Sequence, residues 1–176
     1  MNTLLTPTAK PINWVGVVLL ALTFWFSSSL LIDFVVMPGM FVSGMMTQPD
    51  FGTAGYGLFW VFNRLELVCA ALILTGLLVT RQARQEQAVM VSGMRSRWAV
   101  EIAVVLLAIT LVLTYGLSPA MGGLGISLNL FEPTHVPAAM DQLHGLYFGL
   151  EALKLLGCAA LLKLTFKDLR VDSPAR

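Results

Sequence analysis

Seven polar or charged side chains lie inside apolar stretches of the sequence, where such groups are energetically expensive. A charge at the centre of a bilayer costs about 2.5–3.5 kcal/mol even on insertion scales. Such residues should therefore pair with one another or line a path for an ion, a proton or a small solute. The seven are Asp33, Asn63, Arg64, Glu66, His144, Glu151 and Lys154.

Helix geometry predicts which of these groups meet. Glu66 and Lys154 each lie about eleven residues into a helix that enters from the side of the membrane opposite the termini, called the outer side below. At 1.5 Å per residue this is roughly 15 Å deep, near the bilayer centre, and we expect an ion pair between them. Arg64 points about 160° away from Glu66, and we expect it to extend outward to Asp33.

Glu151 is left without an assigned partner. Spacings of seven and three place His144, Glu151 and Lys154 on one helix face, and a spacing of three places Asn63 on the face of Glu66. Two interpretations stay open. Either the charges only lock the helices together, or they form a polar path or site, with Glu151 and His144 as its centre.

These residues must be positioned by membrane-spanning helices. The 176 residues are 57% hydrophobic and only 12% charged, with a mean hydropathy of +0.79, whereas soluble domains carry about 25% charged residues. A span needs about 20 mostly apolar residues. The sequence predicts one all-α membrane domain over residues 1–176, a four-helix transmembrane bundle with helices near 13–37, 55–80, 98–120 and 142–165.

The basic residues predict the orientation. Of the 11 Lys and Arg residues, none lies in the loops 38–54 and 121–141, and all but Arg64 and Lys154 lie near the termini or in the middle loop. The positive-inside rule puts the Lys- and Arg-rich side in the cytoplasm. We therefore expect cytoplasmic N- and C-termini in a bacterial inner membrane, or in a thylakoid membrane if the source is cyanobacterial.

The chain repeats itself at an offset near half its length. Gly57-Leu58-Phe59-Trp60 aligns with Gly145-Leu146-Tyr147-Phe148 at an offset of 88, and Leu30–Phe34 aligns with Leu111–Tyr115 at an offset of 81. We predict two tandem helical hairpins, roughly 13–80 and 98–165, related by an axis along the membrane normal. Chance similarity between apolar helices is the alternative. At the offset of 88, Glu66 falls opposite Lys154.

Motifs for other functions are missing. The sequence has no glycine-rich phosphate loop, no HExxH and no nucleophile elbow, so we expect no enzyme and no catalytic residues. No basic patch predicts nucleic-acid binding. The two cysteines, Cys69 and Cys158, lie in apolar runs without a CxxC motif, which is typical of buried apolar residues.

Methionines and histidines on the outer side suggest a copper site. The alternative is a protein without cofactors. Thioether sulfur suits Cu(I), and imidazole suits copper generally. Flexible apolar filling of loops at the membrane surface is the other interpretation of the methionines. The candidate ligands are Met37, Met40, Met45, Met46, His135 and His144.

Three features resemble a known family. They are Asp33-Phe34-Val35-Val36-Met37-Pro38-Gly39-Met40-Phe41 at the end of the first helix, the basic middle loop, and Leu143-His144-Gly145-Leu146 at the start of the fourth. They resemble a bacterial family of small four-helix integral membrane proteins of unknown function, distantly similar to the eukaryotic transmembrane protein associated with cisplatin resistance. The resemblance implies the four-helix layout and no particular activity. Glu151 and Lys154 have no counterpart in the features that carry it.

Two main hypotheses on function follow. The first is a non-enzymatic multi-pass membrane protein that acts through contacts, as an accessory or assembly partner of a larger membrane complex. The second is a transporter of a small solute, ion or metal that uses the polar groups of the second and fourth helices. Beyond the lipid bilayer, the expected partners are a second copy in a homo-oligomer, or that complex. The spacing Gly145-xxx-Gly149 allows a close helix contact, inside the bundle or between subunits.

Overall fold

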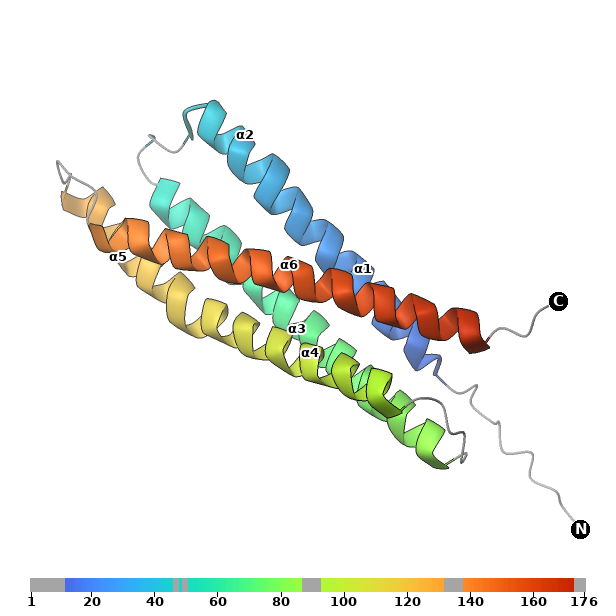
Figure 1. Ribbon diagram of the computed structural model, residues 1–176. Coiled ribbons are helices and arrows are strands. Elements are labelled where there is room, and N and C mark those ends of the chain that lie inside the picture. Colours follow the sequence, from blue (N-terminus) through green and yellow to red (C-terminus); the bar gives the residue numbers. More distant parts are fainter. Residues whose placement is uncertain (1–11, 46–47, 49–50, 87–92, 132–137, 173–176) are drawn as a thin grey trace, which may run out of the picture.

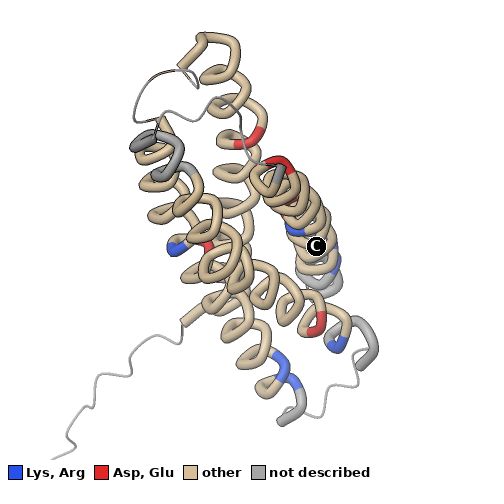
Figure 2. Tube along the Cα trace, turned by 90° about the vertical axis from the view of Figure 1, so that its left-hand side faces the viewer, with Lys and Arg blue, Asp and Glu red and all other residues tan. Residues whose placement is uncertain are grey.

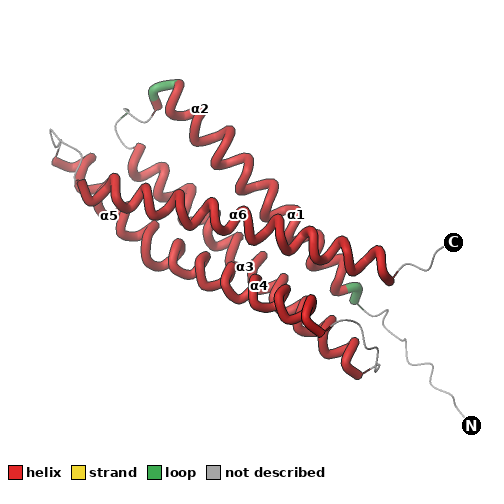
Figure 3. The backbone as a smooth tube through the Cα atoms, viewed as in Figure 1, coloured by secondary structure: helices red, strands yellow, loops and turns green. Residues whose placement is uncertain are grey.

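The computed structural model describes residues 12–45, 48, 51–86, 93–131 and 138–172. These residues are almost entirely helical (Figures 1 and 3). The first span consists of α1 (Trp14–Leu31), the π-helical turn η1 (Ile32–Val36) and α2 (Met37–Val42), and the second is α3 (Phe51–Glu86). The third consists of α4 (Gly93–Val112), the π-helical turn η3 (Leu113–Leu117) and α5 (Ser118–Phe131), and the fourth is α6 (Ala138–Asp172).

Four helices are long and apolar enough to cross a membrane, which confirms the predicted all-α bundle of four spans. They cover Trp14–Val42, Phe51–Arg84, Arg97–Leu124 and Ala139–Lys167. Large apolar side chains remain exposed on their outward faces, where they meet lipid, among them Leu20, Phe24, Val68, Val105 and Leu156. The chain is an integral membrane protein.

The predicted outer loops were too long. Helix occupies much of the expected loops 38–54 and 121–141, because α2 and α5 continue the first and third spans. The glycines and prolines there suggested loops, but a membrane helix tolerates both, since its neighbours and local widening of the helix satisfy the freed backbone groups. Most of the described residues in these two segments therefore lie on helices.

A proline explains the widened turn in each of these two spans. Pro38 follows η1, and Pro119 follows η3, each two residues after the last π-helical residue. Proline lacks the N–H for a bond to the carbonyl one turn earlier, and its ring crowds that carbonyl. The backbone N–H groups just before the prolines reach back five residues instead, from Met37 to Ile32 and from Ser118 to Leu113.

The four spans form a ring in which α3 and α6 face each other across the centre. Among the described residues, α1 packs against α3 and α6, and α4 packs against the same two helices, whereas no direct backbone approach joins α3 to α6. Residues on facing sides of α3 and α6 therefore meet in the middle of the bundle. Long side chains are needed to bridge that diagonal.

The apolar core is continuous on the side of the termini and incomplete on the outer side. On the terminal side, Leu22, Ile73, Leu106, Cys158 and Leu161 come from all four spans and are at most 2% exposed. On the outer side the third span packs through α5 against α3 and α6, whereas η1 and α2 approach only their own helical continuation within the described chain. Figure 1 shows α2 standing apart from its neighbours. The outer end of the first span is thus loosely packed.

Glycines mark the closest helix approaches. A Cβ at Gly76 would collide with the side chain of Val18 and lie 3.5 Å from the carbonyl oxygen of Trp14. Gly145 and Gly149, by contrast, are exposed and have nothing within 4 Å of the corresponding position. The Gly145-xxx-Gly149 pair therefore makes no close helix contact with the residues that the structure describes.

We expect Gly76→Ala to destabilise the fold by about 1–3 kcal/mol, because the extra methyl group forces α1 away from α3. The two free cysteines are buried and report unfolding when a thiol-reactive dye reaches them during heating in detergent. Gly149→Ala is the matched control and should leave the unfolding temperature unchanged. Equal unfolding temperatures for Gly76→Ala and the wild type would show that α1 and α3 are not in close contact.

Candidate functional site

The centre of the bundle holds an ion-paired cluster on α3 and α6. The Lys154 ammonium group contacts Glu66 Oε1 across the diagonal and lies 2.6 Å from Glu151 Oε1 one turn away on its own helix. Glu66 and Lys154 are each 1% exposed, and Glu151 is 3% exposed. The expected pair of Glu66 with Lys154 is confirmed, and the structure adds Glu151, which the sequence left without a partner.

The first span completes the environment of Glu66. Trp25 Nε1 donates a hydrogen bond to Glu66 Oε1 at 2.9 Å, and Ser29 Oγ donates to the same oxygen at 3.0 Å. Both side chains are 1% exposed. Neither residue was predicted from the sequence to belong to the cluster. Their spacing of four places them on one helix face, and this was the only available signal.

Asp33 joins the cluster from the widened turn η1. It is placed beside the Glu151 carboxyl group and within electrostatic reach of Lys154. The predicted pair of Asp33 with Arg64 is wrong. Arg64 lies on another face of α3, where its guanidinium carbon is 3.5 Å above the Trp60 ring and Nη1 donates to the Trp60 carbonyl oxygen at 3.0 Å. The aromatic ring provides the arginine with a local cation–π partner.

Asn63 and the third span form a neighbouring polar stripe. Asn63 Nδ2 donates to Ser118 Oγ at 2.6 Å. Thr110 and Thr114 lie closer to the terminal side than Ser118, and both are buried. Each threonine hydroxyl group donates to a carbonyl oxygen one turn earlier on its own helix. These residues recur every four positions on the third span. Spacing could have identified them, but hydroxyl groups are common in membrane helices and carry no charge.

The outer candidates do not join this cluster. His144 is exposed, and its Nδ1 lies 2.9 Å from the Met140 carbonyl oxygen of the preceding turn. Among the copper candidates, Met37 and Met40 are half-buried and Met45 is exposed. Met46 and His135 lie outside the described residues. In the described part of the chain, no three His, Cys, Asp or Glu side chains are arranged to hold a metal ion.

The cluster has more acidic groups than its one lysine can balance. Asp33, Glu66 and Glu151 surround Lys154, so full ionisation would leave two uncompensated negative charges in the low-dielectric interior. Four buried polar oxygens near it lack a hydrogen-bond donor: Asp33 Oδ2, Asn63 Oδ1, Glu66 Oε2 and Glu151 Oε2. An uncompensated buried charge costs several kcal/mol. Chemically, the cluster can take up a proton.

The surroundings of the cluster differ on its two sides. Toward the termini lies the apolar layer of Leu22, Ile73, Leu106 and Leu161, which are all buried. Toward the outer side, Asp33 is half-buried and belongs to the span that stands apart from its neighbours. Asp33 is thus the most exposed of the three carboxyl groups of the cluster.

Comparison with known proteins assigns no function to this chain. No family model matches the chain, and neither curated proteins nor solved structures include a significant match to it.

Proposed function

We propose that this protein is a non-enzymatic membrane transporter that binds a proton at Asp33, Glu66 and Glu151 and passes it across the bilayer. The surplus of carboxylates over lysine in the buried cluster carries this proposal. Ionisable groups at this depth typically serve proton relays or ion paths when they are not fully compensated. A bound proton removes one negative charge and supplies a donor to one of the oxygens that lack one.

A proton suits this site better than a metal ion. The Lys154 ammonium group already occupies the position between Glu66 and Glu151 where a small cation would lie. A divalent ion would need several oxygen ligands converging on one point, and the described residues contain no such group. The copper alternative rests on the outer methionines alone and is independent of this cluster.

The loose outer end of the first span supports transport over a purely locking role. A transporter needs access to its site from one side at a time, and structural repeats commonly provide the two arrangements. The third span packs through α5 against α3 and α6, whereas α2 approaches no other span in the described part of the chain. We infer that α2 moves onto α3 and α6 when the site closes toward the outer side.

An internal duplication would account for this relation between the spans. The π-helical turns begin at residues 32 and 113, which is an offset of 81. At the offset of 88, buried residues of α3 fall opposite buried residues of α6: Asn63, Glu66, Ala70 and Ile73 opposite Glu151, Lys154, Cys158 and Leu161. We propose that the hairpins 13–80 and 98–165 are repeats, in which the matching positions Glu66 and Lys154 acquired opposite charges. This supports two related packing states.

We expect Glu151→Gln to abolish proton flux, since an amide cannot take up the proton. Liposomes containing the protein and an internal pH-sensitive dye are given an acid pulse outside, and the wild type should acidify them faster than protein-free liposomes. Glu101→Gln, an exposed carboxyl-to-amide change on α4, is the matched control and should keep the flux. Flux equal to protein-free liposomes, or unchanged flux in Glu151→Gln, would overturn the proposal.

An infrared measurement separates binding from transport. We expect the absorption of a protonated carboxyl group in the wild type at neutral pH and its reduction in Glu151→Gln or Asp33→Asn, but not in Glu101→Gln. The absence of this absorption in the wild type would contradict proton binding in the cluster. If the absorption is present but no flux is seen, the cluster binds a proton and only locks the helices together, and the transporter proposal is wrong.

The accessory hypothesis has one observation in its favour. Phe34, Val35, Phe41 and Val42 on the separated end of the first span are apolar and at least 60% exposed. A partner helix in a larger membrane complex could cover them. Purification from the native membrane in mild detergent distinguishes the two, because a stoichiometric partner favours the accessory role and a lone homo-oligomer favours transport.

The orientation and origin inferred from the sequence belong to this proposal. We infer a bacterial membrane protein with both termini in the cytoplasm, related to the four-helix family it resembles. Figure 2 shows few charged residues along the middle of the helices and a group of basic residues where α3 ends and α4 begins. This distribution supports the positive-inside orientation. The separated α2 then lies at the outer surface.

A further inference from the structure

The hydrogen-bond donors of the central cluster are unevenly distributed over its carboxyl oxygens. Glu66 Oε1 accepts hydrogen bonds from Trp25, Ser29 and Lys154. Glu151 Oε2, by contrast, is buried and accepts no hydrogen bond from the residues that the structure describes. A buried acceptor without a donor destabilises the folded state, and more so when it is charged. The ionised form of Glu151 therefore needs a further donor.

Tyr147 brings an unused donor close to this oxygen. It precedes Glu151 by four residues on α6, so the two share a helix face, with Tyr147 one turn nearer the outer side. Its side chain is only 5% exposed. The phenol group lies within electrostatic reach of Glu151, Glu66 and Asp33, and within the described chain it donates to no acceptor. A donor and an acceptor that both lack partners are thus neighbours.

Apolar and aromatic neighbours hold the Tyr147 ring in place. The ring meets that of Phe59 on α3 edge to face, with 5.5 Å between the centroids and 67° between the planes. It also packs against the buried side chains of Leu113 and Leu117 on the third span. These neighbours offer the hydroxyl group no acceptor. They contact the ring, so the packing would survive removal of the hydroxyl group.

We propose that Tyr147 is a positioning residue of the proton site, whose hydroxyl group donates through one water molecule to Glu151 Oε2 when this carboxyl group is ionised. The inference rests on the proposed proton transport and names a group that sets when the site is loaded. A hydrogen bond to the charged form of a group favours that form, and a bond through water is nearly as favourable as a direct one. Tyr147 therefore weakens proton binding and helps the proton to leave.

The remaining charged and titratable groups around Glu151 come from three elements. They are Asp33 on η1, Glu66 on α3, and Lys154 and Cys158 on α6 itself. On the third span, the buried residues of η3 are uncharged. All of these groups remain when the hydroxyl group of Tyr147 is removed, so a change in the pH of proton binding would report the lost hydrogen bond.

Infrared titration of Tyr147→Phe in detergent tests the inference. We expect the absorption of the protonated carboxyl group to persist to a pH about one unit higher than in the wild type, because loss of a donor to the ionised form strengthens proton binding about tenfold. The pH of half-maximal proton flux into liposomes should rise equally. A purely structural role for Tyr147 would instead lower the flux at every pH and leave both midpoints unchanged.

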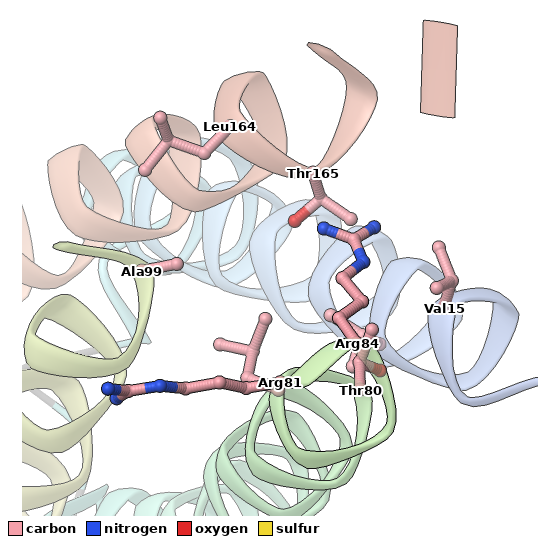
Figure 4. A pocket seen from close by; sticks show the side chains of 9 residues that line it. Val15, Thr80, Arg81, Arg84, Ala99, Leu164 and Thr165 are labelled. Carbon is pink, nitrogen blue, oxygen red and sulfur yellow. The ribbon is translucent and has the colours of Figure 1, made fainter. Parts of the chain in front are cut away.

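Two control variants remove a hydroxyl group elsewhere. Tyr115→Phe changes a tyrosine of the third span that is 64% exposed. Thr165→Val changes a buried threonine that Figure 4 shows in a pocket of about 40 Å³ at the terminal end of the bundle. Thr165 follows Glu151 by fourteen residues on α6, which is about 21 Å along the helix. Both variants should keep the wild-type midpoints.

The outcomes separate this inference from the transport proposal. Unchanged midpoints in Tyr147→Phe, with flux as in the wild type, would overturn the role of Tyr147 and leave transport standing. Carboxyl absorption without flux in the wild type would overturn transport, and the infrared midpoint would still test the hydrogen bond. The wild type gives a test that needs no variant: its tyrosine C–O absorption should shift over the pH range in which the carboxyl absorption changes, and a constant tyrosine absorption would overturn the inference.

Discussion

Replacing Lys154 with glutamine is expected to destabilise the fold by about 3–5 kcal/mol, the usual cost of removing one partner from a buried ion pair. The change leaves Asp33, Glu66 and Glu151 together in the interior without a cation. Glu66→Gln should be milder, because Lys154 keeps Glu151 at 2.6 Å and the negative surplus falls. Folded yield in detergent and the unfolding temperature measure both effects.

The double variant separates pairing from general damage at this position. Glu66→Gln combined with Lys154→Gln should fold better than Lys154→Gln alone, since fewer uncompensated carboxylates remain. The double variant should not fold better than Glu66→Gln alone, because Glu151 and Asp33 also depend on the lysine for charge compensation. Lys163→Gln, an exposed change on α6, is the control and should be neutral. Equal stability of Lys154→Gln and Glu66→Gln would contradict a lysine shared by several carboxylates.

Trp25→Phe is expected to cost about 2 kcal/mol, within the range for a hydrogen bond to a charged acceptor. The indole N–H holds Glu66 Oε1 at 2.9 Å, and phenylalanine retains most of the apolar contact but none of the donor capacity. The remaining donors to that oxygen are Ser29 and Lys154. The unfolding temperature in detergent checks the size of the loss.

A matched tryptophan tests whether the hydrogen bond or the ring is responsible. Trp98 is 58% exposed at the start of α4, so Trp98→Phe should leave stability unchanged. Combining Trp25→Phe with Glu66→Gln should cost less than the sum of the two changes, because both remove the same interaction. A strictly additive result would mean that Trp25 stabilises the bundle only by filling space.

Hydropathy and charge alone determine the four-span layout of this protein. Runs of apolar residues around Trp14–Ile32 and Ile102–Ala120 require helices, since only a helix satisfies its own backbone in lipid. The pair of Glu66 and Lys154 was also predictable. Two charges at equal depth on different spans have few other partners, so desolvation forces them together.

Helix ends and the remaining pairs were not predictable in this way. Glycine and proline near residues 38–44 and 119–125 indicate loops in a soluble protein, yet here they lie on helices or in widened turns. Arg64 was assigned to Asp33 by charge, but a stacked tryptophan on its own helix satisfied it first. Local partners cost less ordering entropy than partners on another span, and charge matching does not include this term.

Only the tertiary structure decided that three carboxylates share one lysine. The sequence places Asp33, Glu66 and Glu151 on three different helices, and their convergence depends on the widened turn η1 and on the diagonal arrangement of α3 and α6. Spacing along a helix determines which residues share a face, but not how far each face is rotated toward the centre. That rotation follows from close approaches such as Gly76 against Val18, which act between helices and are set by packing of the whole bundle.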